Sequence, residues 1–312
     1  MPLRVLFFGT PEFAVPSLVA LVQSPHTVVG VVTQPDRPRG RGHKSQPEAI
    51  KRTALERGLT VFQPERLKDP AFLDILRERQ PDLAVVAAYG RLLPQALLDV
   101  PRLGFINVHA SLLPRWRGAA PVHRAILAGD HETGVTIMRV VLALDAGPMI
   151  SQERTPIDPD ETSEALESRL SVLGARLLVT SIDRMISGTA SETPQDDRLA
   201  TYAPRLERAD GELTWARPAT EIHNRIRGLQ PWPLVATHLK GRRVLLRRSK
   251  IAQTDSSGAE PGTIVSVGAE GLVVATSPGA VAILEAQPEG KRTMPARDFA
   301  NGAHVRVGDR FN

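Results

Sequence analysis

Short apolar runs alternate with longer mixed segments through the first 110 residues, and this alternation most strongly limits what the chain can fold into. The runs are rich in Val, Leu, Ile and Phe and carry almost no charge, which is typical of strands buried on both faces. The segments between them have the length and the end signals of helices. We therefore predict an α/β fold with a parallel sheet, with strands at 3–8, 27–33, 60–62, 81–90 and 104–110 and helices at 47–58 and 70–79.

The turn after the first strand, GTPEFA at 9–14, tests what such a sheet would bind. A dinucleotide-binding fold carries G-x-G-x-x-G here, and a triphosphate loop carries G-x-x-x-x-G-K-[ST]. The turn has one glycine, and the second pattern is absent from the sequence. We expect Thr10 to cap a helix that starts at Pro11. The fold is thus expected to be Rossmann-like without a nucleotide signature, with its site at the carboxyl ends of the strands.

The sequence pattern changes near residue 187. Leucines recur at helical spacing through 161–187, whereas 187–197 is small, polar and proline-containing, which is typical of a linker. After 205 a helix is expected near 217–228, and then short strands separated by Gly and Pro turns, as in a small β-barrel. We expect a Rossmann-like domain at 1–188, a linker at 189–205 and a small OB-like β-barrel domain at 206–312.

Composition indicates the compartment and the kind of partner. The sequence has no cysteine, so disulfides and thiolate chemistry are excluded, and no apolar run is long enough to span a bilayer. The first residues do not have the regions of a signal peptide, so we expect a cytoplasmic protein with no membrane partner. The net charge of +5 favours a polyanionic partner, although a solvated basic surface accounts for it equally well.

Two polar side chains interrupt the last apolar run, GFINVHA at 104–110. Asn107 and His109 are two residues apart, so on a strand they point to the same face. In a sheet covered on both faces that face would be core, and a polar pair is tolerated only where the strand ends and a crevice opens. Ser111 and Pro114 end the strand there. A single His is more often structural, but this pair indicates a site.

Asp145 is the candidate partner, in a Leu-Asp-Ala-Gly loop between two further strands expected within 132–151. Taken alone it would be a turn residue. Together, however, Asn, His and Asp suit the transfer of an acyl or formyl group to an amine. Two donors stabilise the tetrahedral oxyanion, and the carboxylate orients the imidazole and manages the amine proton. G-x-S-x-G and the His spacings of metal sites are absent, so we expect no serine nucleophile and no metal.

These residues resemble the tetrahydrofolate-dependent formyltransferases. The resemblance rests on Asn107-x-His109, SLLP at 111–114 and Asp145 in LDAG, and it extends through FFGTPEFAVPSL (7–18), TQPDRPRGRGHK (33–44), GVTIM (134–138) and PWP (231–233). Within this family, the sequence most resembles the branch that formylates methionyl-tRNA. The resemblance implies that 10-formyltetrahydrofolate is the formyl donor, that the initiator tRNA is the partner, and that Asn107, His109 and Asp145 are catalytic. We expect the enzyme to be a monomer.

The resemblance also assigns binding residues. For folate it implies the motif Ser111, Leu112, Leu113 and Pro114, with the strand end from Val86 to Tyr89 and Gly90 lining the pterin pocket. For tRNA it implies the loop 34–46, which here carries Arg37, Arg39, Arg41 and Lys44. A second basic stretch, KGRRVLLRRSK at 240–250, would place Arg242, Arg243 and Arg247 on a phosphate-binding face, or on a charged, solvated strand edge.

Two other functions remain open from the residues. A formyltransferase of the same fold that acts on a small amine, such as an amino sugar nucleotide, would share Asn107, His109, SLLP and Asp145 but would not need the basic stretches. A non-catalytic RNA-binding protein would use the basic barrel and leave the polar residues at the strand end unexplained. Salt-dependent binding of tRNA would distinguish a tRNA enzyme from an enzyme that acts on a small amine. Formyl transfer to any amine would exclude the non-catalytic RNA-binding protein.

Overall fold

The computed structural model describes residues 1–36, 48–254, 256, 258–268 and 271–312 of the chain. The chain divides into two compact units, and its path passes between them more than once. The first unit comprises Met1–Pro121, Thr133–Thr155 and Glu167–Ala203, and the second comprises Val122–Glu132, Pro156–Leu166 and Pro204–Asn312. Each unit contains a sheet of its own.

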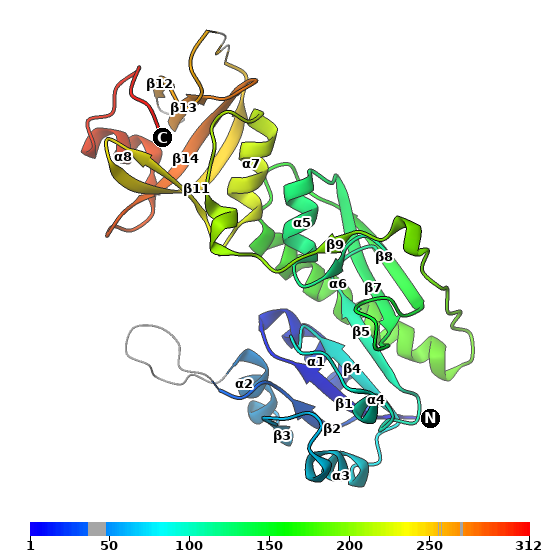
Figure 1. Cartoon of the computed structure of the whole chain (residues 1–312). Helices are drawn as coiled ribbons and strands as arrows, with labels where there is room; N and C mark the ends of the chain where they lie inside the picture. Colours follow the sequence, from blue (N-terminus) through cyan, green and yellow to red (C-terminus); the bar gives the residue numbers. More distant parts are fainter. Residues whose placement is uncertain (37–47, 255, 257, 269–270) are drawn as a thin grey trace. The chain divides into compact units, whose positions relative to one another are not determined.

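A seven-stranded sheet in the order β3-β2-β1-β4-β5-β7-β8 forms the first unit (Figure 1). The first five strands of this order are parallel, as the apolar runs predict, and β7 is antiparallel to β5. The strands are β1 Arg4–Gly9, β2 Thr27–Val32, β3 Val61–Phe62, β4 Leu83–Ala87, β5 Phe105–His109, β7 Glu132–Arg139 and β8 Met149–Pro156.

Helices lie between these strands along the chain, and α6 follows the last of them, β8. They are α1 Val15–Gln23, α2 Ala49–Glu56, α3 Pro70–Glu78, α4 Gln95–Leu98, α5 Pro121–Ala128 and α6 Ser163–Ile186, with 3-10 turns at Glu12–Ala14 and Asp197–Leu199. Part of the core is aromatic: the ring of Phe8 contacts those of Tyr89 and Phe105 at centroid distances of 5.5 and 5.3 Å. The parallel α/β architecture predicted from the sequence is confirmed.

The predicted helix cap at Thr10 is wrong. The chain first makes the short turn at Glu12–Ala14, and α1 begins only at Val15, so Thr10 is too far from the helix to bind its free N–H groups. Its hydroxyl instead donates a hydrogen bond to the main-chain oxygen of Tyr89, at 3.4 Å. Thr10 therefore links the turn after β1 to the turn after β4.

The second sheet is antiparallel, with the order β10-β11-β14-β13-β12 and β15 paired to β14. The domain of short strands that the sequence predicts near the carboxyl end, as a small OB-like barrel, is thus present as an antiparallel sheet. Its elements are α7 Ala219–Gly228, β10 Val235–Leu239, β11 Arg242–Ala252, β12 Ile264–Gly268, β13 Gly271–Ala275, β14 Ala280–Pro288, β15 Met294–Pro295 and α8 Ala296–Gly302, with a 3-10 turn at Arg208–Gly211 before them.

Two short strands complete the structure. β6 Arg117–Gly118 pairs in parallel with β9 Tyr202–Ala203, both in the first unit. Among the described residues, no helix has the length and apolar character needed to cross a membrane.

Candidate active site

Strand β5 carries the predicted pair Asn107 and His109. It lies between β4 and β7, with Asn107 opposite Val86 and Met138, and it ends at His109, one residue before the predicted end. Asn107 is half-buried, whereas His109 is only 5% exposed. The two side chains share a face because they are two residues apart on one strand. The pair therefore lies at the carboxyl end of the parallel strands, where crevices open in such sheets.

Asp145 is brought to this strand end by the connection between β7 and β8. Its Oδ2 lies 3.8 Å from Nδ1 of His109, and both side chains are largely buried. The N–H of Gly118 donates to the same Oδ2 at 2.9 Å. Asp145 has a φ of +48°, in the left-handed region that Asp tolerates better than most residues. The carboxylate is thus held in place by the main chain as well as by its position beside the imidazole.

The side chain of Gln195 fixes the loop that presents Asp145. Its Nε2 donates to the main-chain oxygens of Asp145 and Gly147, both at 2.8 Å. Its Oε1 accepts a hydrogen bond from Nε of Arg117 at 2.9 Å. Sequence reasoning missed Gln195, because it lies in the polar segment 187–197 that was interpreted as a linker. Main-chain acceptors such as these leave no mark on residue identity, so no sequence pattern pointed to it.

The second ring nitrogen of His109, Nε2, forms a hydrogen bond with the main chain of the loop after β5. Nε2 lies 2.7 Å from the main-chain oxygen of Trp116. A carbonyl only accepts, so Nε2 carries a proton. Nδ1 faces the carboxylate of Asp145 at 3.8 Å, which is longer than a hydrogen bond. The imidazole is therefore held by the oxygen of Trp116, and its other nitrogen is directed toward the carboxylate.

The SLLP segment forms a tight turn after β5. Thr136 in β7 anchors it: its hydroxyl donates to the oxygen of Ser111 at 2.7 Å and accepts from the N–H of Leu113 at 3.2 Å. The side chains of Ser111 and Leu113 are buried, whereas Leu112 and Pro114 are half-buried. Of the four residues assigned to folate, Leu112 and Pro114 thus have side-chain surface to offer a ligand.

Tyr89 and Gly90 form the turn after β4. The Tyr89 side chain is 1% exposed and packs edge-on against Phe8, and burial raises the pKa of its hydroxyl. Its main-chain oxygen accepts from Nε2 of Gln34 at 2.7 Å. Gly90 is exposed with a φ of +78°, and a Cβ there would lie 2.8 Å from Nε2 of Gln34. Only main-chain groups of this turn are therefore available to a ligand, and Gln34 holds them in place.

The four basic residues of the first predicted tRNA-binding loop, Arg37, Arg39, Arg41 and Lys44, lie outside the described residues. Asp36, the last described residue before this loop, accepts two hydrogen bonds through its carboxylate. One comes from Lys51 and the other from Nε2 of Gln63, at 2.9 Å. These hydrogen bonds, that of Lys51 first, lower the pKa of Asp36.

The second basic stretch lies on β11. Arg242 and Arg243 are exposed and Arg247 is half-buried, while Val244 and Leu246 between them are buried. The pairing of β11 with β14 shifts register on both sides of Arg248, so the strict alternation of faces ends at that point. Arg243 precedes the irregularity and lies on the side opposite to the buried pair, whereas Arg247 falls within it, between Leu246 and Arg248.

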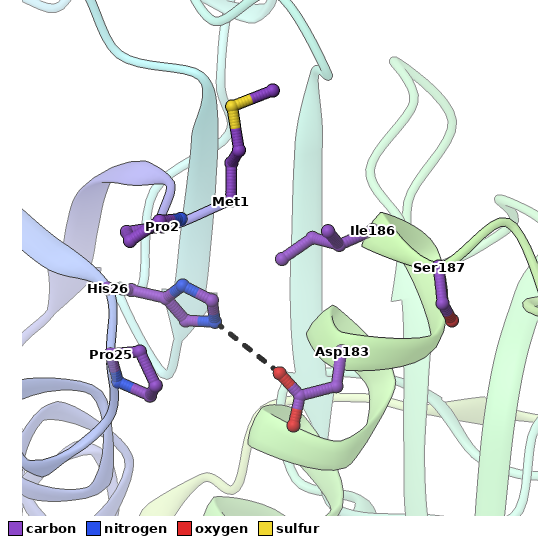
Figure 2. A pocket seen from close by; sticks show the side chains of 7 residues that line it. All are labelled: Met1, Pro2, Pro25, His26, Asp183, Ile186 and Ser187. Carbon is purple, nitrogen blue, oxygen red and sulfur yellow. Dashed lines mark ion pairs between the residues drawn. The ribbon is translucent and has the colours of Figure 1, made fainter.

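A hollow of about 290 Å³ lies elsewhere in the first unit (Figure 2). Figure 2 shows His26 and Asp183 facing one another across it, with Nε2 and Oδ1 3.8 Å apart. Nδ1 of His26 accepts from the N–H of Leu3 at 3.3 Å, so in the neutral ring Nε2 carries the proton; burial lowers the pKa of His26. His26 directly precedes β2, so the hollow lies at the amino ends of the strands, away from Asn107 and His109.

Within the parts of the chain that the structure describes, no group of three or more His, Asp or Glu residues could hold a metal ion.

Comparison with protein families gives two matches. Residues 3–182 match the model described as formyl transferase, and residues 205–304 match the formyl transferase C-terminal domain. Together they cover both sheets of the structure.

Two curated relatives are similar over nearly their whole length. A methionyl-tRNA formyltransferase of Symbiobacterium thermophilum is 49% identical over 99% of this chain and 95% of its own. That of Bacillus subtilis is 46% identical, over 98% of this chain and 96% of its own. A solved N-formyltransferase of Helicobacter canadensis, in complex with folinic acid and dTDP-3-aminofucose, shares the fold with a TM-score of 0.69 at 18% identity, covering 92% of this chain and 99% of that one.

Proposed function

The chain belongs to the formyl transferase family, and we propose that it transfers the formyl group of 10-formyltetrahydrofolate to the α-amino group of methionine on the initiator tRNA. It is an enzyme that acts on methionyl-tRNA, because relatives of that activity match it at 44–49% identity over nearly its full length. The product, N-formylmethionyl-tRNA, would serve translation initiation.

The observation that carries the proposed chemistry is the pair His109 and Asp145, 3.8 Å apart at the strand end that also carries Asn107. Asn107 is half-buried, so its amide can donate to a ligand in the crevice. An amide donor, an imidazole and a carboxylate are the groups that an acyl transfer to an amine needs.

We assign one role to each residue. The lone pair of the methionyl amine forms a bond to the formyl carbon, and the formyl oxygen becomes an oxyanion. The Asn107 amide donates to that oxyanion, and the imidazole of His109, protonated between Trp116 and Asp145, stabilises its charge. Asp145 accepts the proton that the amine loses. Collapse of the intermediate re-forms the carbonyl and breaks the carbon–nitrogen bond to the folate, whose nitrogen takes up the proton that Asp145 accepted from the amine.

The proposal also assigns residues to the binding of folate and of tRNA. We propose that Ser111, Leu112, Leu113 and Pro114, with the main chain of Tyr89 and Gly90, form the folate wall; the half-buried Leu112 and Pro114 support this. We propose that catalysis belongs to residues 1–188 and that Arg242, Arg243 and Arg247 of 206–312 contact tRNA phosphates, together with Arg37, Arg39, Arg41 and Lys44. The exposed guanidinium groups of β11 support this, since Arg binds phosphate oxygens in a bidentate manner. We propose that the enzyme works as a monomer in the cytoplasm.

A formyl-transfer assay with several acceptors in parallel tests the proposal. The purified chain is supplied with 10-formyltetrahydrofolate and with methionyl initiator tRNA, methionyl elongator tRNA, free methionine or an amino sugar nucleotide. Product on the initiator tRNA alone, with a KM for tRNA that rises steeply with salt, is the expected result. Transfer to the amino sugar nucleotide but to no tRNA would overturn it.

A further inference from the structure

Tyr202 lies next to the candidate active site because β9 pairs with β6. Gly118 is paired with Ala203, and the N–H of Arg117 donates to the oxygen of Thr201 at 2.9 Å. This pairing joins the segment that contains Tyr202 to the loop after β5. Two residues distant in the sequence, Tyr202 and Asp145, are thereby both brought to Gly118.

One edge of the Tyr202 ring packs against Gly118. A Cβ at Gly118 would lie 2.9 Å from Cε2 and 3.2 Å from Cδ2 of Tyr202, so only a glycine allows the ring to approach this closely. The N–H of the same Gly118 donates to Oδ2 of Asp145 at 2.9 Å. The ring and the carboxylate thus contact the same residue.

The Tyr202 side chain is nevertheless 60% exposed. A large aromatic ring that rests on the backbone on one side and is open to solvent elsewhere has unused area for another flat group. Tyr89, the other tyrosine of the sequence, is buried in the core. Nearby, the guanidinium of Arg115 stacks over the ring of Trp116 at 3.9 Å, so cationic and aromatic groups already meet in this loop.

We infer that Tyr202 is the platform on which the 3′-terminal nucleobase of the aminoacyl-tRNA stacks. The inference rests on the proposed function. The methionyl group is esterified to the ribose of the terminal nucleoside, so when its amine lies at Asp145, only the short aminoacyl ester and one ribose separate it from the base. The end of a tRNA is single-stranded, and single-stranded bases bind to proteins by stacking on aromatic side chains. Tyr202 and Asp145 both contact Gly118, so the exposed ring lies in the neighbourhood that the base would occupy.

The first test compares steady-state kinetics of Tyr202→Ala, Tyr202→Leu and Tyr202→Phe. Loss of one base–aromatic contact typically weakens binding by about 5- to 150-fold. We expect Tyr202→Ala and Tyr202→Leu to raise the KM for methionyl-tRNA by an amount in this range and to leave the KM for 10-formyltetrahydrofolate unchanged. Tyr202→Phe, which keeps the ring, restores the wild-type KM. Leu199→Ala, at a 65% exposed position of the same segment, is the matched control and should behave as the wild type.

A second measurement distinguishes stacking from phosphate contact. The affinity for tRNA is measured against salt concentration for the wild type and Tyr202→Ala. A stacking residue releases no counterions, so the variant should bind more weakly with an unchanged slope of log K against log salt. A KM for tRNA unchanged in Tyr202→Ala, a changed KM for folate alone, or an equal loss in Tyr202→Phe would each overturn the inference. If the wild type itself formylates no tRNA, the proposed function fails first and the inference falls with it.

Discussion

Nδ1 of His109 lies 3.8 Å from Oδ2 of Asp145, and the same carboxylate oxygen accepts the N–H of Gly118. The distance is longer than a normal hydrogen bond, so the carboxylate acts on the imidazole mainly through its charge. Because Gly118 fixes one oxygen of Asp145, the carboxylate does not depend on the imidazole for its position. A change in charge at Asp145 can therefore be made without displacing the side chain.

Asp145→Asn should lower turnover while leaving the fold intact. The amide oxygen can still accept from Gly118, but the side chain no longer stabilises a protonated His109 or accepts the amine proton. Loss of such a proton-transfer group typically costs about 10²–10⁴ in rate. Single-turnover formylation and a thermal melt check this. A variant with near wild-type turnover would remove Asp145 from the proton transfer.

Asn107→Ala should lower kcat by about 10²–10³, the usual cost of one oxyanion donor. The side chain is half-buried, so its loss should change the melting temperature little. The comparison is Asn301→Ala, at an exposed position of α8, which should keep full activity. Equal kcat in the two variants would contradict the role assigned to Asn107.

Gln195→Glu tests whether the hydrogen bonds from Gln195 position the loop that carries Asp145. Glu has nearly the shape of Gln but no N–H groups, so the hydrogen bonds to the oxygens of Asp145 and Gly147 are lost, and a negatively charged carboxylate oxygen faces these two carbonyl oxygens. Small displacements of a catalytic group cost up to about 10²-fold in rate. We expect kcat to fall by about 10- to 100-fold with little change in the KM for tRNA. If instead the KM rises and kcat is unchanged, Gln195 acts in binding and not in positioning.

Stability should fall in mild acid, with His223 as one cause. Its Nε2 donates to the oxygen of Pro159 at 2.9 Å, and Nδ1 lies 3.0 Å from Oγ of Ser249. Burial, with a smaller effect of Arg227, lowers the pKa of His223 below 6.5, against the hydrogen bond to Pro159 and the charge of Asp160. The unfolded chain therefore binds the proton more readily than the folded one.

The sign of this effect fixes the pH window. Above about pH 6.5 both states are neutral and His223 contributes no pH dependence. As the pH falls from there to the lowered pKa, the free energy of unfolding decreases, and below that pKa it levels off. Melting temperatures between pH 5 and 8 should show the decrease, and His223→Gln should reduce its slope. Since burial also lowers the pKa of His26 and His123, part of the slope should remain. An unchanged slope in His223→Gln would contradict the prediction.

Several features could be predicted because they depend on local pattern. The apolar runs specified the parallel strands, since a strand buried on both faces cannot alternate with polar residues. The polar pair Asn107 and His109 marked the end of β5 because two such side chains are tolerated only where the sheet opens. The loop position of Asp145 was also readable, and the structure brings it beside His109.

Other features could not be predicted, because main-chain atoms carry no residue identity. The oxygen of Trp116 that binds His109 and the N–H of Gly118 that binds Asp145 would be present with almost any side chain. The cap expected at Thr10 failed because the chain inserts a short turn before α1, which no local signal required. The basic face of β11 is interrupted at Arg248 by a change of register that depends on its partner strand.

The sequence by itself thus determined which segments are strands, where the reactive side chains lie along them and to which family the chain belongs, because hydrophobic periodicity and side-chain chemistry are local properties. Tertiary structure decided how those side chains are held. Gln195 and Tyr202 come from a polar segment without a periodic pattern. Tyr202 reaches the site because β9 pairs with β6, and Gln195 because its amide binds the main-chain oxygens of Asp145 and Gly147. Such contacts depend on where distant backbones meet in space, and that is set by the packing of the whole unit.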